Sequence, residues 1–186
     1  MTTETPTPTP TPGRYAIDVP RSGITFTTKH LFGLGTVHGS FRLRGGAVSL
    51  TDPPTGTRVD AVADAASFDT GNEKRDSQVL SKTLLDTAGY PDIAFNSTAV
   101  EADGAGAWVL RGQLTAHGVS APVTFAVTKA EAVGDEIAIE ATTTVDRYAH
   151  GVTKLKGLAG RYLHLTATVR ARRADDGPAG PGSPGE

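Results

Sequence analysis

The chain has 186 residues, a formal net charge of −2 and no cysteine. This length is sufficient for one domain with a substantial core, and the near-neutral charge gives no field that would attract nucleic acid. Without cysteine, disulfides, thiol catalysis and cysteine-ligated metals are excluded. No apolar run approaches the roughly 18 residues that a membrane-spanning helix needs.

The two ends of the chain differ in composition from the middle. Residues 1–13 repeat Thr-Pro, and residues 174–186 are rich in Gly and Pro. Such segments bury little apolar surface and favour extended conformations, so we expect disordered tails on either side of a folded domain at 14–173. The N-terminal segment also lacks the basic start and apolar stretch of a secretory signal, from which we expect a cytoplasmic protein.

Most of the predicted domain alternates between apolar and polar residues with the period of a strand. The first two segments, Tyr15–Val19 and Ile24–Thr28, are separated by Pro20 and Gly23, and the next, at 36–50, contains a glycine pair that predicts a bulge or bend. Further alternating segments follow at 59–68, 93–99, 108–115, 123–127, 137–145 and 161–173. About eight strands joined mostly by short turns predict a mainly β antiparallel barrel or sandwich.

Residues 67–95 contain the one stretch in which the pattern turns helical. Val79, Leu80 and Leu84 recur at helical spacing, and a glycine and a proline follow them. We therefore expect one helix at about 72–86 between two strands. Its apolar stripe has to cover something, either an open end of the barrel or its outer wall.

The start of this helix carries several polar residues. Thr70 and Glu73 have the spacing of a capping box, and Asn72 is an alternative cap. Asp69 and Asp76 flank the same turn. A pair of carboxylates can act in acid–base catalysis, but capping and interaction with the helix dipole is the simpler interpretation here.

An eight-stranded barrel has an interior that side chains can fill or that one slender ligand can occupy. Many residues on the candidate inward rows are small: Ala61, Ala63, Ala65, Ser97, Ala99, Gly112, Ala141 and Thr143. Because protein cores pack densely, too few large side chains favour a hollow interior. The alternation alone does not decide which row faces inward.

The five histidines show none of the short spacings of a metal site. His30, in a Lys-His-Leu sequence, either anchors a turn or lines a pocket mouth. Lys74 and Arg75 form a solvated helix face, or they meet a lipid headgroup or an anionic membrane surface. For Asp146 and Arg147 we expect an internal ion pair at a barrel end.

Four ordered stretches resemble the YceI-like family. They are FDTGNEKRD at 68–76 with the strand that starts at Tyr90-Pro91, SGITFTTKHLFGLGTVHGSF at 22–41, GQLTAHGVSAPV at 112–123, and Val145-Asp146-Arg147 followed by His-Gly. The resemblance covers about 15–173. It implies an extended lipocalin-like, eight-stranded antiparallel barrel that holds a long isoprenoid lipid, either a polyprenyl phosphate or an isoprenoid quinone, for storage, transport or protection.

The resemblance also sets expectations for site and partners. We expect no catalytic residues and no metal, an isoprenoid lipid as ligand, transient contact with a membrane surface, and a homodimer. The residues expected to line the lipid pocket are Phe26, His30, Phe32, Phe41, Phe68, Leu80, Leu84, Phe95, Trp108, Leu114, Phe125 and Ile139.

Two alternatives remain open at the level of sequence. The first is an enzyme in which His30 and Asp69 act on a small substrate in the cavity, which would need polar groups that converge inside the barrel. The second is a filled barrel that binds partners only on its surface. The 148–160 segment is also shorter than in many relatives, so headgroup selectivity does not carry over from the resemblance.

Overall fold

The computed structural model describes residues 10–174, and ten strand segments run through them. The strands are β1 (Gly13–Ile17), β2 (Gly23–His30), β3 (Gly35–Phe41), β4 (Leu43–Leu50), β5 (Arg58–Asp64), β6 (Asp92–Ala102), β7 (Trp108–Ala116), β8 (Val119–Val133), β9 (Glu136–Asp146) and β10 (Ala159–Arg173). The helical segments are α1 (Glu73–Leu80) and the 3-10 turns η1 (Val19–Arg21), η2 (Pro54–Gly56), η3 (Ala65–Ser67) and η4 (Arg147–His150). The two expected tails fall largely on residues 1–9 and 175–186, which lie outside the described part.

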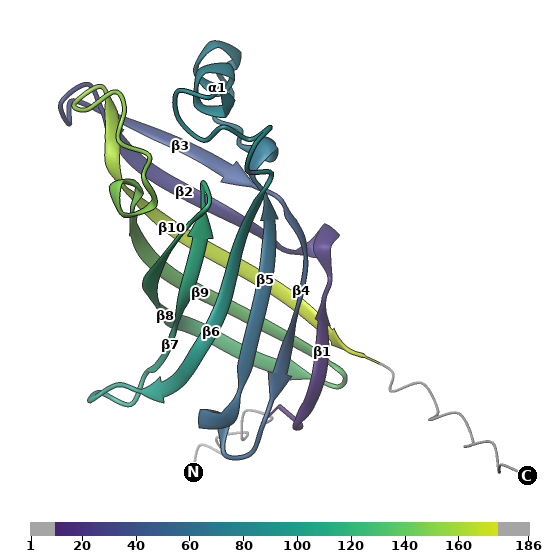
Figure 1. Cartoon of the computed structure of the whole chain (residues 1–186). Coiled ribbons are helices and arrows are strands. Elements are labelled where there is room, and N and C mark those ends of the chain that lie inside the picture. Colours follow the sequence, from purple (N-terminus) through teal and green to yellow (C-terminus); the bar gives the residue numbers. More distant parts are fainter. Residues whose placement is uncertain (1–9, 175–186) are drawn as a thin grey trace, which may run out of the picture.

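Antiparallel pairing closes these strands into a barrel (Figure 1). The ring runs β1-β4-β5-β6-β7-β8-β9-β10, and β10 pairs back to β1. Because η1, which contains Pro20, interrupts the first strand, β1 pairs with the end of β10 and β2 pairs with its beginning. The expected eight-stranded antiparallel barrel with one α-helix is therefore confirmed in the described residues.

The glycine pair in β4 produces the predicted irregularity. The register between β4 and β5 shifts between Leu43 and Gly45. At Gly46 the backbones approach so closely that a Cβ atom would lie 2.2 Å from the carbonyl oxygen of Asp60. Only glycine fits such an approach, and the bend that results helps the sheet to curve into a barrel.

The helix is shorter than the predicted 72–86, because α1 ends at Leu80. The hydroxyl of Ser81 donates to the carbonyl of Gln78, and the chain then turns so that the amide of Leu85 donates to the carbonyl of Val79. The apolar spacing thus continues beyond the helix into a turn, and periodicity alone does not distinguish this turn from a further turn of helix.

The cap of α1 is Asn72, whose Oδ1 accepts from the amide of Arg75 at 3.0 Å. The capping-box prediction for Thr70 and Glu73 is wrong, because the hydroxyl and amide of Thr70 donate to the carboxylate of Asp76 instead. These bonds fix the turn that leads into α1.

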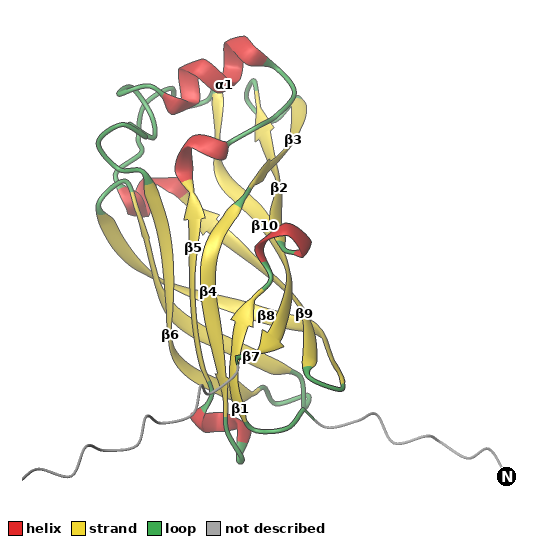
Figure 2. Cartoon of the chain, turned by 90° about the vertical axis from the view of Figure 1, so that its right-hand side faces the viewer, coloured by secondary structure: helices red, strands yellow, loops and turns green. Residues whose placement is uncertain are grey.

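The two ends of the barrel are built differently. At one end β3 has β2 on one side and, among the described residues, only a bridge from Ser40 to Asp69 on the other. There α1 and the neighbouring loops lie over the barrel (Figures 1 and 2). The other end is filled by a packed cluster that includes the fully buried Tyr15, Val48 and Ile137. The barrel therefore has a floor and a mouth.

Candidate functional site

A cavity of about 530 Å³ occupies the interior of the barrel between the floor and the mouth. Phe26, Phe41 and Phe68 form one wall, with ring centroids 5.3–5.6 Å apart. Phe95 and Phe125 form another, with centroids 5.2 Å apart in an edge-to-face arrangement. This volume lies within the usual range of ligand-binding pockets.

The cavity extends along the barrel. Along β10 its lining extends from Ala159 to Val169, which at about 3.4 Å per residue is about 34 Å of strand. Ala61, Ala63 and Ala167 lie in the wall, and their short side chains leave the centre empty. Of the eight small residues named from the sequence, only Ala61 and Ala63 line the cavity, and Thr143 lies instead with His38 and His164. The small-residue argument is therefore supported on β5 alone.

Most of the residues predicted for the pocket line this cavity. The eight that do so are Phe26, His30, Phe41, Phe68, Leu84, Phe95, Leu114 and Phe125. Five of the six phenylalanines in the chain are among them. Phe26, Phe41, Phe95 and Phe125 come from strands far apart in sequence, and Phe68 follows η3. Barrel closure brings these five together.

The structure places the other four predicted residues outside the cavity wall. Phe32 lies in the β2–β3 turn and is 79% exposed. Leu80 packs against the aromatic wall without reaching the cavity. Ile139 packs into the floor cluster, and Trp108 begins β7 next to a turn. Alternation assigns a residue to a face, but it does not tell how far along the barrel axis the cavity extends.

Several lining residues were missed by sequence reasoning. Leu155 and Leu158 lie in the loop before β10, and Arg147, His150 and Val152 lie in or just after η4. These segments are too short and irregular to show a period. For Arg147 and His150 the signal was the Asp-Arg and His-Gly motif, which did not indicate that they line a cavity. Ile24, Leu163 and Leu165 lie on alternating rows and could have been named once the inward row was known.

Polar side chains gather at the mouth. Asn72 and Gln78 lie beside Lys74 and Arg75 at the start of α1 and on its first turns, and Arg147 of η4 lines the same cavity. Among the described residues that line the cavity, every charged side chain is a cation and none is a carboxylate. The charged groups that line the cavity are therefore cations, whereas the rest of the lining is largely apolar. Glu73 and Asp76 also lie on the first turn of α1, outside the lining.

Arg147 is the most buried of these cations, with 9% exposure. Its Nε, Nη1 and Nη2 atoms donate to the carbonyls of Gly160, Val152 and Ala159 at 2.8, 2.6 and 3.1 Å. Burial lowers the pKa of this guanidinium, but an arginine remains protonated in proteins. Arg147 thus ties the loop before β10 to the barrel and leaves a buried positive charge at the cavity.

The predicted ion pair between Asp146 and Arg147 is wrong. Asp146 instead accepts from Arg161, with Nη2 2.7 Å from Oδ2, and it caps η4 by accepting from the amide of Tyr148 at 3.0 Å. The hydrogen bond from Arg161 lowers the pKa of Asp146. In the described residues no carboxylate forms a salt bridge with Arg147, whose partners are carbonyl oxygens.

The remaining candidates for chemistry do not converge. Asp69 is absent from the cavity wall, and its carboxylate accepts from the amide of Gly71 at 2.7 Å. Nδ1 of the buried His150 lies 2.9 Å from the carbonyl oxygen of Val119. His38 and His164 lie on the outer face of the sheet. Within residues 10–174, no three His, Asp or Glu side chains are grouped to hold a metal ion.

Comparison with known proteins identifies the family. A model described as the YceI-like domain matches residues 15–171. The chain belongs to the YceI-like family. Its UPF0312 relatives include a Pseudomonas savastanoi protein that is 34% identical over 56% of this chain and 55% of its own length. A Pseudomonas putida relative is 31% identical over 78% of both chains. The chain thus spans about half the length of some of these relatives and more of others.

Solved structures share the fold. Burkholderia cenocepacia BcnA has a TM-score of 0.72 and 22% identity, and it covers 83% of this chain and 98% of its own. A polyisoprenoid binding domain from Saccharophagus degradans, implicated in plant cell wall breakdown, has a TM-score of 0.66 and 15% identity over 86% and 98%. No helix in residues 10–174 has the length and apolarity needed to cross a membrane.

Proposed function

We propose that this YceI-like protein holds one long-chain isoprenoid lipid inside its barrel, for storage, transport or protection. The observation that carries the proposal is the long apolar cavity of about 530 Å³ with a single polar end. A chain of repeated branched units suits a tunnel lined by phenylalanine, leucine and alanine. The solved polyisoprenoid binding domain with the same fold supports the proposal by analogy.

Affinity in this proposal comes from the hydrocarbon chain. Each buried CH₂-sized group contributes about 0.8 kcal/mol, so several isoprene units offset the cost of immobilising a flexible ligand. Selectivity then depends on the groups at the mouth, because the apolar wall offers little discrimination among hydrocarbon chains.

The mouth favours an anionic headgroup over a neutral one. Lys74, Arg75 and Arg147 are the charged lining residues, and no carboxylate accompanies them in the wall. Guanidinium groups match the geometry of phosphate oxygens. We therefore place a polyprenyl phosphate ahead of an isoprenoid quinone as the ligand.

Neither alternative function gains from the structure. An enzyme acting in the cavity would need polar groups that converge there, and Asp69 is not in the wall with His30. A barrel that acts only through its surface would have a filled interior, which a cavity of about 530 Å³ contradicts. The proposal is accordingly a binding protein without catalysis.

The test is a titration of delipidated protein with three ligands of equal prenyl length: a polyprenyl phosphate, a quinone and a neutral prenol. We expect all three to bind and the phosphate to bind most tightly. The double change Lys74→Gln and Arg75→Gln should reduce the preference for phosphate, whereas Lys82→Gln should not, because Lys82 lies outside the cavity wall. Failure of all three ligands to bind would refute the proposal.

A further inference from the structure

Large apolar side chains are exposed around the mouth of the barrel. Leu34 is 90% exposed and Phe32 is 79% exposed, and both lie in the turn between β2 and β3. Leu31, in the same turn, and Leu158, in the loop before β10, are each about half exposed. Clustered exposed apolar residues of this size mark a contact surface. We call residues 31–34 together with Leu158 the apolar tip.

The backbone holds the apolar tip in an outward position. The amides of Leu31 and Phe32 donate to the carbonyls of Leu158 and Gly157 at 3.1 and 2.6 Å. Leu31 and Phe32 have φ values of 51° and 56°, a left-handed conformation that is uncommon for bulky side chains. Such conformations persist only where the surroundings hold them, and they are concentrated at functional sites.

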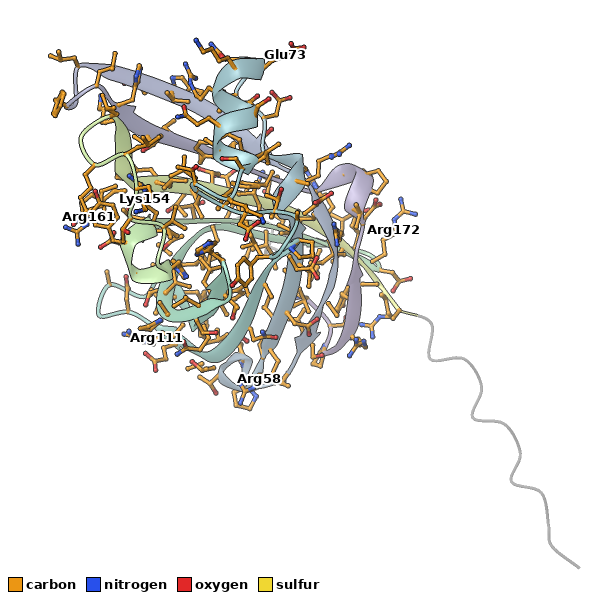
Figure 3. All side chains as sticks on the ribbon, turned by 45° about the horizontal axis from the view of Figure 1, so that its top comes forward. Arg58, Glu73, Arg111, Lys154, Arg161 and Arg172 are labelled. Carbon is orange, nitrogen blue, oxygen red and sulfur yellow. The ribbon has the colours of Figure 1, made fainter. Side chains whose placement is uncertain are left out.

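The segments that form the apolar tip carry positive charge only. Residues 19–51 and 147–174 contain no Asp or Glu. Lys29, Lys154 and Lys156 form no salt bridge within the described part of the chain, in contrast to Lys129, which pairs with Glu131. Figure 3 shows Lys154 near Arg161, whose charge is paired with Asp146, and away from Arg58. Exposed apolar residues with flanking lysines are typical of segments that bind anionic membranes.

The apolar tip is continuous with the cavity. Leu158 is about half exposed on the surface and also lines the cavity. Leu155 nearby and His30 at the end of β2 line the cavity as well. An apolar path therefore leads from the exposed turn into the barrel. A lipid chain that moves along it would not have to cross water.

We propose that the apolar tip docks on the surface of an anionic bilayer, with Phe32 and Leu34 entering the headgroup region and the lysines contacting lipid phosphates. The passage of an isoprenoid lipid between bilayer and cavity rests on the proposed function. Docking itself does not, because it needs only the tip and its charges.

The experiment is co-sedimentation of the full chain with vesicles of phosphatidylcholine containing phosphatidylglycerol, and with vesicles of phosphatidylcholine alone. We expect binding to the anionic vesicles that falls with added salt. The double change Phe32→Ser and Leu34→Ser should weaken it by about tenfold or more. The control is Val133→Ser, since Val133 is 76% exposed but lies beside the β8–β9 turn, at the floor end where Asp135 accepts from the amide of Arg173.

A second pair of variants tests the charges at matched net charge. Lys154→Glu with Lys156→Glu should abolish the preference for anionic vesicles, and Lys129→Glu with Arg58→Glu should leave most of it. Equal vesicle binding by parent and tip variants overturns the proposal. The proposal is also overturned if the parent is a dimer that binds no vesicles and a tip variant is a monomer. The apolar tip is then an interface between two copies of the chain.

Loading with lipid from detergent separates docking from the proposed function. Tip variants should accept lipid delivered in detergent micelles as well as the parent does and should lose only uptake from vesicles. If the parent docks on vesicles but accepts no isoprenoid lipid from either source, docking stands and the proposed function fails. If the parent accepts lipid from detergent and does not dock on vesicles, the proposed function stands and the docking proposal fails.

Discussion

Replacing Leu84 tests whether the segment after α1 closes the mouth of the cavity. Leu84 is 5% exposed and lines the cavity, whereas Leu80, one turn earlier, is half-buried against the aromatic wall and does not reach it. Leu84→Ala removes about three CH₂-sized groups, or about 2–3 kcal/mol of transfer free energy. The additional cost of a new void should be small, because Leu84 already borders empty space. Leu80→Ala should cost about 1 kcal/mol.

Urea denaturation of the delipidated protein measures both values, and lipid retention gives an independent readout. Leu84→Gln would place an unpaired amide against hydrocarbon, which is costly, so it should lower lipid affinity by at least about tenfold. Leu80→Gln is the matched control and should retain lipid. The reasoning is refuted if Leu84→Ala costs no more than Leu80→Ala, or if a folded Leu84→Gln protein holds its lipid as tightly as the parent.

Two further predictions concern stability. The pKa values of Glu136 and Asp146 are lowered, chiefly by hydrogen bonds from Arg21 and Arg161. Both carboxylates therefore stabilise the fold above their unfolded pKa values near 4. This contribution is lost as the pH falls through the lower pKa values of the folded state. In the Asp146→Asn variant the free energy of unfolding should therefore fall less steeply between about pH 5 and pH 3. The difference from the parent should be less than about 1 kcal/mol, because the ion pair is partly exposed. An unchanged dependence of stability on acid pH would contradict this prediction. Deleting residues 1–9 and 175–186 should leave Tm within a few degrees of the parent value. Extending the N-terminal deletion through residue 12 should lower Tm, because it removes the Thr11 carbonyl that accepts a hydrogen bond from the Tyr15 hydroxyl at 2.7 Å. Equal Tm values for the two deletions would count against that contact.

The sequence predicted the strands well because alternation with period two is a strong local signal. It also placed the bend of β4 at its glycine pair. The end of α1 was predicted too late, because Leu84 keeps the helical spacing in a turn that Ser81 begins. Whether eight strands make a barrel or a sandwich depends on the pairing of β1 with β10, which no local pattern reveals.

The candidate site was predictable only in part. Four phenylalanines inside strands, and Phe68 just after η3, line the cavity, whereas Phe32 lies in the β2–β3 turn and is exposed. Ile139 lies below the cavity, since its height along the axis is set by barrel register. The buried charge of Arg147 depends on three carbonyls 5 to 13 residues away, one in the loop after η4 and two at the start of β10, and sequence spacing gives no sign of them.

The central claim is that one lipid lies inside the barrel, and native mass spectrometry of two variants tests it most directly. Ala167 lines the cavity, and its neighbour Thr168 is exposed, so strand alternation places Thr168 on the outer face. After incubation with a polyprenyl phosphate, the parent and Thr168→Trp should each carry one lipid per chain. Ala167→Trp should fold and carry none, because the indole fills the space. Lipid bound equally by Ala167→Trp, or no lipid on the parent, would contradict the account.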